Sequence, residues 1–190
     1  MLVMDALLNS LLVVSSGYAM YTLHPVQHPY GYGAATVSLV HGLLGVVRAT
    51  RNDDDECNRL RLIMSGVMEI APLPLLNIEL YLKSSSNGLA LGHGCFVVPL
   101  AYDMLAKLGD NEDNATESLK ELTLLGNLVS LLFLGVNQSS NIYGAMAAVV
   151  FGARYGSLIL DCYQEGLGSD FRLLSNSLFI VLMTLTLSAK

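Results

Sequence analysis

LRLIMSGVMEIAPLPLLNIELYL, residues 60–82, decides the fold of this chain. An α-helix rises about 1.5 Å per residue, so a helix of this length crosses the roughly 30 Å hydrocarbon core of a bilayer. The stretch nevertheless carries Glu69 near its middle and Glu79 near its end, with Pro72 and Pro74 between them. A carboxylate beside a helix break inside a membrane must face protein or water, because lipid cannot solvate it.

The rest of the chain has the same apolar character. Of its 190 residues, 53% are hydrophobic and only 14% are charged, whereas a soluble domain carries about 25% charged residues. We therefore predict an all-α polytopic membrane protein whose main partner is the lipid bilayer. It forms one transmembrane domain over residues 1–190, with seven spans near residues 2–23, 31–47, 60–82, 88–108, 119–136, 140–160 and 173–189.

Three other classes of protein do not fit this pattern. A soluble helical bundle would show polar residues every three or four positions on its outer faces, and segments such as LVSLLFLGV (residues 128–136) lack them. A transmembrane β-barrel would alternate apolar and polar residues, and these segments do not. The basic residues are too few and scattered to form the stripe that nucleic-acid binding requires, so no nucleic-acid partner is predicted.

The distribution of Lys and Arg predicts the orientation. With seven spans, eight of these ten residues lie on the side of the N-terminus and two on the other side. If the third stretch turned back as a re-entrant loop, the split would become six against four, so the count favours a spanning helix interrupted by its prolines. The N-terminus is therefore expected in the cytoplasm and the C-terminus in the lumen or outside. We expect the membrane to be the endoplasmic reticulum or another endomembrane.

Glu69 is the centre of the candidate site. It lies about 13 Å from the cytoplasmic end of its span, and His41 and Arg154 lie about 9 Å deep in theirs. Pro72 and Pro74 leave backbone carbonyls without helical partners within one turn of Glu69. These features fit a cation or proton site in a broken helix, and equally a structural kink whose carboxyl bonds to a neighbouring helix. Arg154 is the predicted counter-ion, although it could instead extend to the cytoplasm. His41 could equally be a neutral core residue. The predicted polar layer consists of Asp5, Asn9, His41, Glu69, Asp103 and Arg154.

Two further acids have local partners in the sequence. Glu79 precedes Lys83 by four residues, and Asp103 precedes Lys107 by four residues. Each spacing predicts an ion pair on one helix face near the membrane surface. The lone His93 is interpreted as structural, because no second histidine stands at metal-ligand spacing. No metal site is predicted.

Small residues recur every four positions along the sixth stretch, at Gly144, Ala148, Gly152 and Gly156. Such a face lets two helices approach closely within lipid. Inside a seven-span bundle it predicts internal helix packing. The alternative is a contact with a second copy of the chain or with another membrane protein.

PLPLLNIELYL (residues 72–82) and NIYGAMAAVVFGA (residues 141–153) resemble segments of small multi-pass animal proteins known only as transmembrane proteins of uncharacterised function. The resemblance implies a membrane architecture and supplies no activity.

The sequence carries no motif of an enzyme. It lacks a nucleophile elbow, a phosphate loop, a zinc-hydrolase motif and a dinucleotide fingerprint, so neither catalysis nor a cofactor is predicted. Two functions remain, and the sequence favours the first, because buried ion pairs alone do not make a transport pathway. The first is a membrane scaffold or assembly partner in which the polar layer holds the helices together. The second is a small solute or proton-coupled transporter with a three-plus-one-plus-three layout of spans and Glu69 at its centre.

Overall fold

The computed structural model describes residues 2–50, 55–109 and 114–189 of the chain. Within these ranges all regular secondary structure is helical, as predicted. The elements are α1 (Leu2–Thr22), α2 (Pro29–Thr50), α3 (Asp55–Ile70), α4 (Pro72–Leu82), η1 (Asn87–Leu89), α5 (Ala90–His93), η2 (Gly94–Phe96), α6 (Val97–Leu108), α7 (Asn114–Asn137), α8 (Asn141–Phe151), η3 (Gly152–Gly156), α9 (Ser157–Tyr163) and α10 (Leu167–Ser188).

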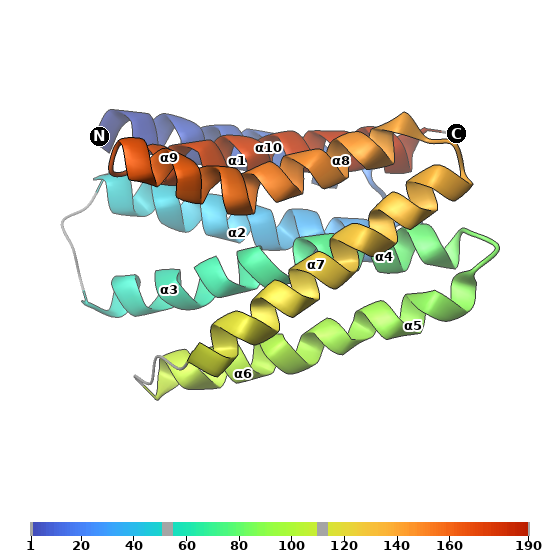
Figure 1. Ribbon diagram of the computed structural model, residues 1–190. Coiled ribbons are helices and arrows are strands. Elements are labelled where there is room, and N and C mark those ends of the chain that lie inside the picture. The colour runs from blue at the N-terminus through green and yellow to red at the C-terminus, as the bar shows by residue number, and fades with distance from the viewer. Residues whose placement is uncertain (1, 51–54, 110–113, 190) are drawn as a thin grey trace.

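Among the described residues, seven helical spans are long and apolar enough to cross a membrane, and each overlaps one predicted stretch. The last span differs most, because it begins at Leu167 and not at residue 173. The two termini lie at opposite ends of the bundle, as an odd number of crossings requires (Figure 1). The end at which α1 begins is called the N-end below, and the end at which α10 finishes is called the C-end.

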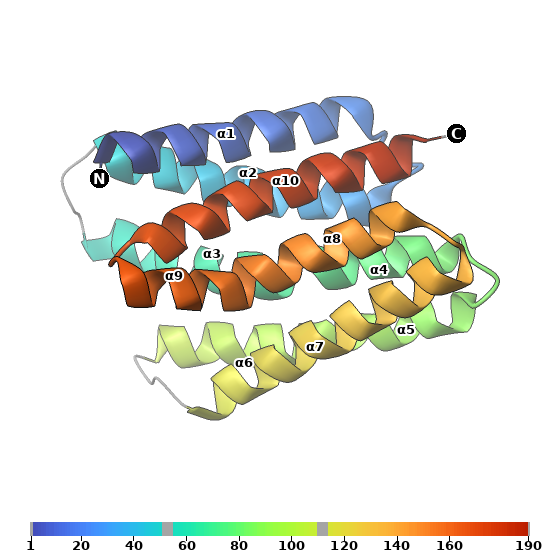
Figure 2. The ribbon, with the colours of Figure 1, turned by 45° about the horizontal axis from the view of Figure 1, so that its top comes forward.

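The third span, residues 59–82, lies at the centre of the bundle. Its apolar window is 61% buried, compared with 22–39% for the other six spans. α3 and α4 meet at Ala71, where Pro72 and Pro74 cannot donate helical hydrogen bonds. The Ala71 N–H still bonds to the Val67 carbonyl at 2.9 Å, and both helices keep one direction (Figures 1 and 2). The prolines therefore interrupt a spanning helix without reversing the chain, as predicted.

Consecutive spans are neighbours around this centre. α2 packs against α1, α3 and α4, while α10 packs against α1, α8 and α9. α7 packs against α4, α6 and α8. The fourth span, from η1 to α6, lies at one edge against α3, α4 and α7 (Figure 2). This order of neighbours is compatible with three spans, one separate span and three further spans.

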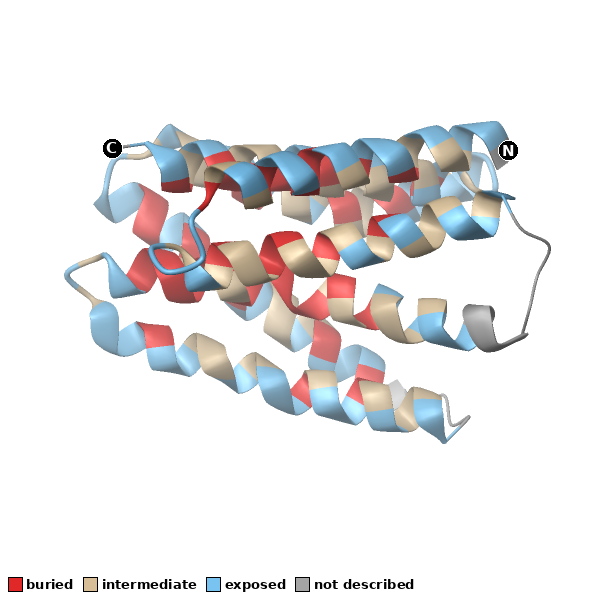
Figure 3. Cartoon of the chain, turned by 180° about the vertical axis from the view of Figure 1, so that it is seen from behind, coloured by how far each residue is buried: buried red, intermediate tan, exposed pale blue. Residues whose placement is uncertain are grey.

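Apolar side chains fill the interior and also cover the outer faces. Leu76 and Ile180 are fully buried in the core, whereas Leu91 is 86% and Val136 79% exposed. The exposed residues lie along the outer sides of the helices (Figure 3). Apolar surface of this extent is unfavourable in water and suits contact with lipid chains. The seven apolar helices thus have the pattern of an integral membrane protein.

Candidate functional site

Arg154 lies at the centre of a group of charges between three spans. It belongs to η3, and its guanidinium contacts Glu69 of α3 together with Glu117 and Glu121 of α7. Its Nη2 atom is 3.2 Å from Glu117 Oε2 and 2.5 Å from Glu121 Oε1. The structure thus brings together Glu69 and Arg154, the pair suggested by their depth along the helices. Hydrogen bonds between ionised groups of this kind are the strongest that side chains form.

Lys120 of α7 extends this group to the fourth span. Its Nζ atom is 2.8 Å from Asp103 Oδ1, 2.6 Å from Glu117 Oε1 and 3.8 Å from Glu69 Oε2. The side chains of Lys120 and Asp103 are only 7% and 2% exposed, and charges this buried are stable only when they are paired. We call the following residues the charged cluster: Glu69, Asp103, Lys107, Glu117, Lys120, Glu121 and Arg154.

The interpretation of Asp103 as a surface anchor is corrected by this geometry. The predicted ion pair exists, with Lys107 Nζ 2.8 Å from Asp103 Oδ2. Asp103 is buried, however, and its second oxygen binds Lys120 of another span. It therefore ties α6 to α7 inside the bundle.

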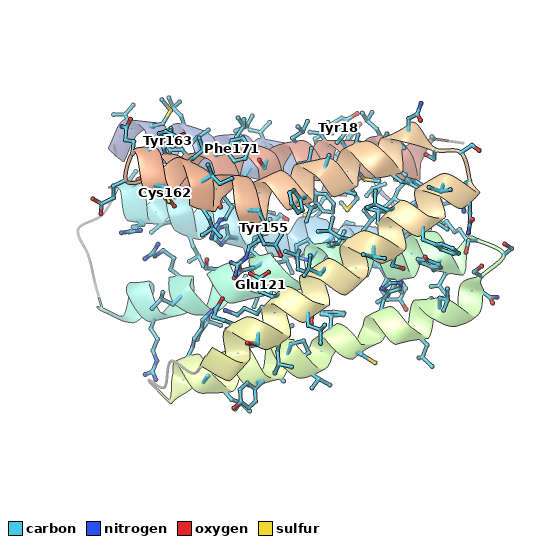
Figure 4. All side chains as sticks on the ribbon, viewed as in Figure 1. Tyr18, Glu121, Tyr155, Cys162, Tyr163 and Phe171 are labelled. Carbon is cyan, nitrogen blue, oxygen red and sulfur yellow. The ribbon has the colours of Figure 1, made fainter. Side chains whose placement is uncertain are left out.

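A π-helical turn, η3, positions Arg154. Such turns are rare and often occur at functional sites. Within it, Arg154 Nε donates to Glu121 Oε1 at 2.7 Å, and the neighbouring Tyr155 hydroxyl donates to Glu121 Oε2 at 2.6 Å. Figure 4 shows Tyr155 and Glu121 on facing sides of η3 and α7. Two adjacent residues of one turn thus bind the same carboxylate.

The same turn divides the predicted small-residue face. A Cβ atom on Gly152 or Gly156 would lie 3.7 or 3.2 Å from the Phe171 ring of α10, so these two glycines pack internally. Ala148 is exposed, and a Cβ atom on Gly144 would meet nothing within 4 Å. A spacing of four residues does not keep one face through a π-helical turn, because that turn holds about one residue more than an α-helical turn.

A cavity of about 70 Å³ lies beside Glu69 and the helix interruption at Ala71. We call it the inner cavity. It has room for a few water molecules, and the Glu69 side chain is 23% exposed, so water can reach this carboxylate. The inner cavity is lined by His41, Ser65, Met68, Glu69, Pro72, Leu73, Leu124, Val150, Ala153, Arg154, Arg172, Ser175, Asn176 and Phe179.

A larger cavity of about 330 Å³, called the outer cavity, adjoins the inner one toward the N-end. Its position follows from lining residues in the first turn of α1, the last turn of α2 and the first turn of α10. The two cavities share His41, Ser65, Arg172 and Asn176. The outer cavity is lined by Asp5, Asn9, His41, Gly45, Arg48, Ala49, Arg61, Ser65, Ser169, Arg172, Leu173 and Asn176.

The predicted polar layer is therefore divided into two parts. Glu69, Asp103 and Arg154 belong to the charged cluster, whereas Asp5 and Asn9 line the outer cavity. His41 stands at the shared wall of both cavities, and its buried Nδ1 atom has no hydrogen-bond partner among the described residues. It lines the inner cavity together with Glu69, and no hydrogen bond joins the two among the described residues. 

Sequence reasoning missed three members of the charged cluster: Glu117, Lys120 and Glu121. The predicted fifth span begins at residue 119, so Glu117 lies just before it, and Lys120 and Glu121 lie in its first turn. The helix begins at Asn114, and other spans bury Lys120, whereas the Glu117 side chain stays 56% exposed. Their spacing is a usable signal, because residues three and four apart share one helix face.

A second buried carboxylate, Glu79, lies toward the C-end. Its predicted partner Lys83 is present at 3.3 Å, but the Glu79 side chain is only 3% exposed and has two further partners. His28 Nδ1 is 2.8 Å from Oε1, and the Gly31 N–H donates to Oε2 at 2.7 Å. Gly31 lies in the first turn of α2, where backbone N–H groups have no helical acceptor. Glu79 therefore fixes the start of α2 against α4 and is more than a surface anchor.

Replacing Glu79 by glutamine should lower the free energy of unfolding by about 1–2 kcal/mol. The amide oxygen can still accept from the Gly31 N–H, but the charge that pairs with His28 and Lys83 is lost. Thermal unfolding in detergent measures the effect. Lys83→Gln is the matched control and should cost at most about 0.5 kcal/mol, because the Lys83 side chain is half exposed. Equal losses in the two variants would contradict this role of Glu79.

A third polar group joins α4, α5 and α7. The Asn77 amide donates to the Asn127 backbone carbonyl at 2.9 Å, and His93 Nδ1 is 2.8 Å from Asn127 Oδ1. Tyr81 donates to the Ser130 carbonyl at 2.9 Å. Every one of these contacts links two helices inside the apolar layer. They agree with the interpretation of His93 as a structural residue.

No set of three or more His, Cys, Asp or Glu side chains with metal-binding geometry occurs in the part of the chain that the structure describes.

Among curated proteins and solved structures no match to the chain is found. A family model described as a domain of unknown function (DUF4791) matches residues 25–187, from the turn before α2 almost to the end of α10. Because this match takes in most of the 190 residues, the chain belongs to the family described as a domain of unknown function, DUF4791.

Proposed function

We propose that this protein is a multi-pass membrane carrier that takes up a small polar solute, or a proton, from the N-end. The observation that carries the proposal is the pair of adjoining cavities. They share four lining residues, and the outer cavity lies toward the N-end while the inner one lies beside the interrupted third span. A protein that served only to pack helices would not need two adjoining cavities lined by arginines and a carboxylate.

The inner cavity has the chemistry of a transport site. Glu69 is partly exposed there and shares Arg154 with two other carboxylates. Carriers commonly bind solutes near the middle of the membrane, where a discontinuous helix presents free backbone groups. Pro72 lines the inner cavity and removes one helical hydrogen bond beside it. A change in the charge or contacts of Glu69 could thereby be coupled to the helix interruption.

We infer from the Lys and Arg distribution that the N-end faces the cytoplasm and the C-end the lumen or exterior of an endomembrane. Solute would then enter the outer cavity from the cytoplasm. Labelling of single cysteines introduced at the two ends of the bundle would test this orientation.

Reconstituted vesicles test the carrier. Wild-type protein should give proton flux, or uptake from a set of labelled phosphate, carboxylate, sugar and amino-acid solutes, above that of empty vesicles. Glu69→Gln should reduce this flux at least tenfold while thermal unfolding shows a folded protein. We expect only modest destabilisation, about 1–2 kcal/mol, because Arg154 keeps two other carboxylates.

Glu117→Gln is the matched control for this experiment. It removes a carboxylate from the same charged cluster, but Glu117 does not line either cavity. Its flux should stay within about twofold of wild type, as expected for a partly exposed ion pair. Equal loss of flux in both variants would argue against a specific role for Glu69, and absence of flux in the wild type would argue against the carrier.

A scaffold or assembly partner is the second candidate. It is favoured by Gly144 and Ala148 of α8, a flat face that no side chain of the described residues covers at Gly144. Such a face would suit a second copy or another membrane protein. If the protein is a scaffold, Gly144→Leu should dissociate an oligomer that cross-linking or native mass spectrometry detects in the wild type. Glu69→Gln should then change the stability, and neither the wild type nor the variant should show flux.

A further inference from the structure

We infer that the outer cavity binds a small anion, through oxygens of phosphate or carboxylate type, with Arg172 as its main ligand. The inference deepens the proposed function and rests on it for the assumption that solute enters this cavity. It names an anion as the ligand held in the outer cavity, before the charged cluster.

The first observation is the charge of the cavity wall. Three arginines from three different helices line the outer cavity: Arg48 of α2, Arg61 of α3 and Arg172 of α10. Asp5 is the one carboxylate among the lining residues. Guanidinium groups stay protonated in proteins, so the wall carries an excess of positive charge. Rings of arginine select anions in membrane pores for this reason.

The second observation is that Arg172 has no counter-ion among the described residues. Arg48 and Arg61 have other interactions within the chain. Arg172 has only the neutral Ser157 hydroxyl, 3.2 Å from its Nη2 atom, among the described residues. Its Nε atom is buried without a hydrogen-bond partner. The Arg172 side chain is only partly buried and lines the outer cavity, so an anion oxygen there could pair with the rest of its guanidinium.

His41 lies with Arg172 in the wall shared by both cavities, and its Nδ1 atom is buried and unpartnered within the described residues. A neutral imidazole has one N–H donor and one acceptor nitrogen, so an anion oxygen can pair with this atom only in the tautomer that protonates it. The arginines of the wall are therefore the groups that select an anion.

The charged cluster explains why the anion would stop at Arg172. The next guanidinium inward, Arg154, is already surrounded by Glu69, Glu117 and Glu121. These carboxylates repel a second anion. The volume of the outer cavity, about 330 Å³, lies within the range of roughly 300–1,000 Å³ that is common for small-ligand sites. Its position at the N-end would admit a free anion from solution or the headgroup of an anionic lipid.

Binding in lipid nanodiscs tests the inference and separates the two sources. In discs of phosphatidylcholine alone, inorganic phosphate or succinate should bind to wild type in calorimetry and raise its thermal unfolding temperature. If the headgroup is the ligand, discs that contain phosphatidylserine should show the stabilisation instead, and mass spectrometry should find that lipid retained. Either result supports an anion site.

Variants decide whether Arg172 carries the binding. Arg172→Gln should weaken binding of the active probe at least tenfold, and Arg172→Lys about threefold, because lysine keeps the charge without the planar donor fork. Arg59→Gln is the charge-matched control: Arg59 is exposed, lies outside both cavities and should leave the affinity unchanged. If Arg172→Gln does not fold, Arg172→Lys still tests the prediction.

The inference is overturned if wild type binds neither phosphate, succinate nor phosphatidylserine, or if folded Arg172 variants bind them as well as wild type. Its failure is distinct from that of the proposed carrier. Flux of a neutral or cationic solute without anion binding would retain the carrier and reject the anion site. Anion binding without flux of any solute would retain the anion site and reject the carrier.

Discussion

Replacing Arg154 by methionine should lower the free energy of unfolding by about 3–5 kcal/mol, the largest effect expected of any single substitution in this protein. Methionine fills similar space but leaves Glu69, Glu117 and Glu121 without their common cation. Lys120 can compensate only in part, since Asp103 also binds it. Thermal or denaturant unfolding of the purified protein in detergent measures the loss, and the amount of folded protein in the membrane should fall with it.

The combination of Arg154→Met with Glu69→Gln separates lost charge balance from lost packing. Removal of one carboxylate should recover part of the stability, so the double variant should be less damaged than the sum of the two single variants. We expect the coupling energy to be on the order of 1–3 kcal/mol. Strictly additive losses would mean that the contact between Glu69 and Arg154 contributes little to the fold.

Replacing Gly168 by alanine should lower the free energy of unfolding by about 3 kcal/mol. Gly168 is buried in α10, and its N–H donates to Asp161 Oδ1 at 2.8 Å. An added Cβ atom would collide with the backbone carbonyl of Ser157 and with the Asp161 carboxylate. A side chain can rotate away, but a helix backbone cannot, so α9 and α10 must separate.

Gly17→Ala is the matched control for this substitution. It makes the same chemical change in α1, at a position where a Cβ atom would meet nothing within 4 Å. There alanine should raise helix stability by up to about 1 kcal/mol, because it restricts the unfolded chain more than glycine does. Comparison of the two unfolding temperatures in one detergent tests the prediction. A Gly168→Ala protein as stable as wild type would show that α9 and α10 are not held this closely.

The spans could be predicted from the sequence because length and apolar character set them directly. Each of the seven structural spans overlaps its predicted stretch. The contact between Glu69 and Arg154 could also be anticipated, since the helical rise gives the depth of each residue in the membrane. Depth alone does not say which way a helix faces. His41 and Asp5 were therefore placed in the same layer as Glu69, although they line cavities and do not join the charged cluster.

The partners of the other buried charges could not be predicted, because spacing within one helix already accounted for those charges. The spacing of Glu79 and Lys83 accounted for both residues on one helix face, so nothing pointed to His28 and Gly31, which the fold brings from the preceding span. Glu117 and Lys120 lie at the predicted edge of the fifth span, where charged residues are common. In the structure other spans bury Lys120, whereas Glu117 stays exposed and pairs with Arg154 and Lys120. Tertiary packing decides which charged side chains are buried, and it cannot be derived from a single sequence.

The π-helical turn of η3 has a consequence for the length of the sixth span. A π-helical turn holds about one residue more than an α-helical turn, so the segment beyond it is rotated by about 100° relative to an uninterrupted α-helix. Arg154, within the turn, faces the carboxylates of α7, while Asp161, beyond it, accepts the hydrogen bond from Gly168 of α10. Deletion of one residue between Gly152 and Gly156 would restore a regular helix and misalign one of these two contacts. Insertions and deletions in family members should therefore avoid this turn, even though no residue in it is needed for the helix to span a bilayer.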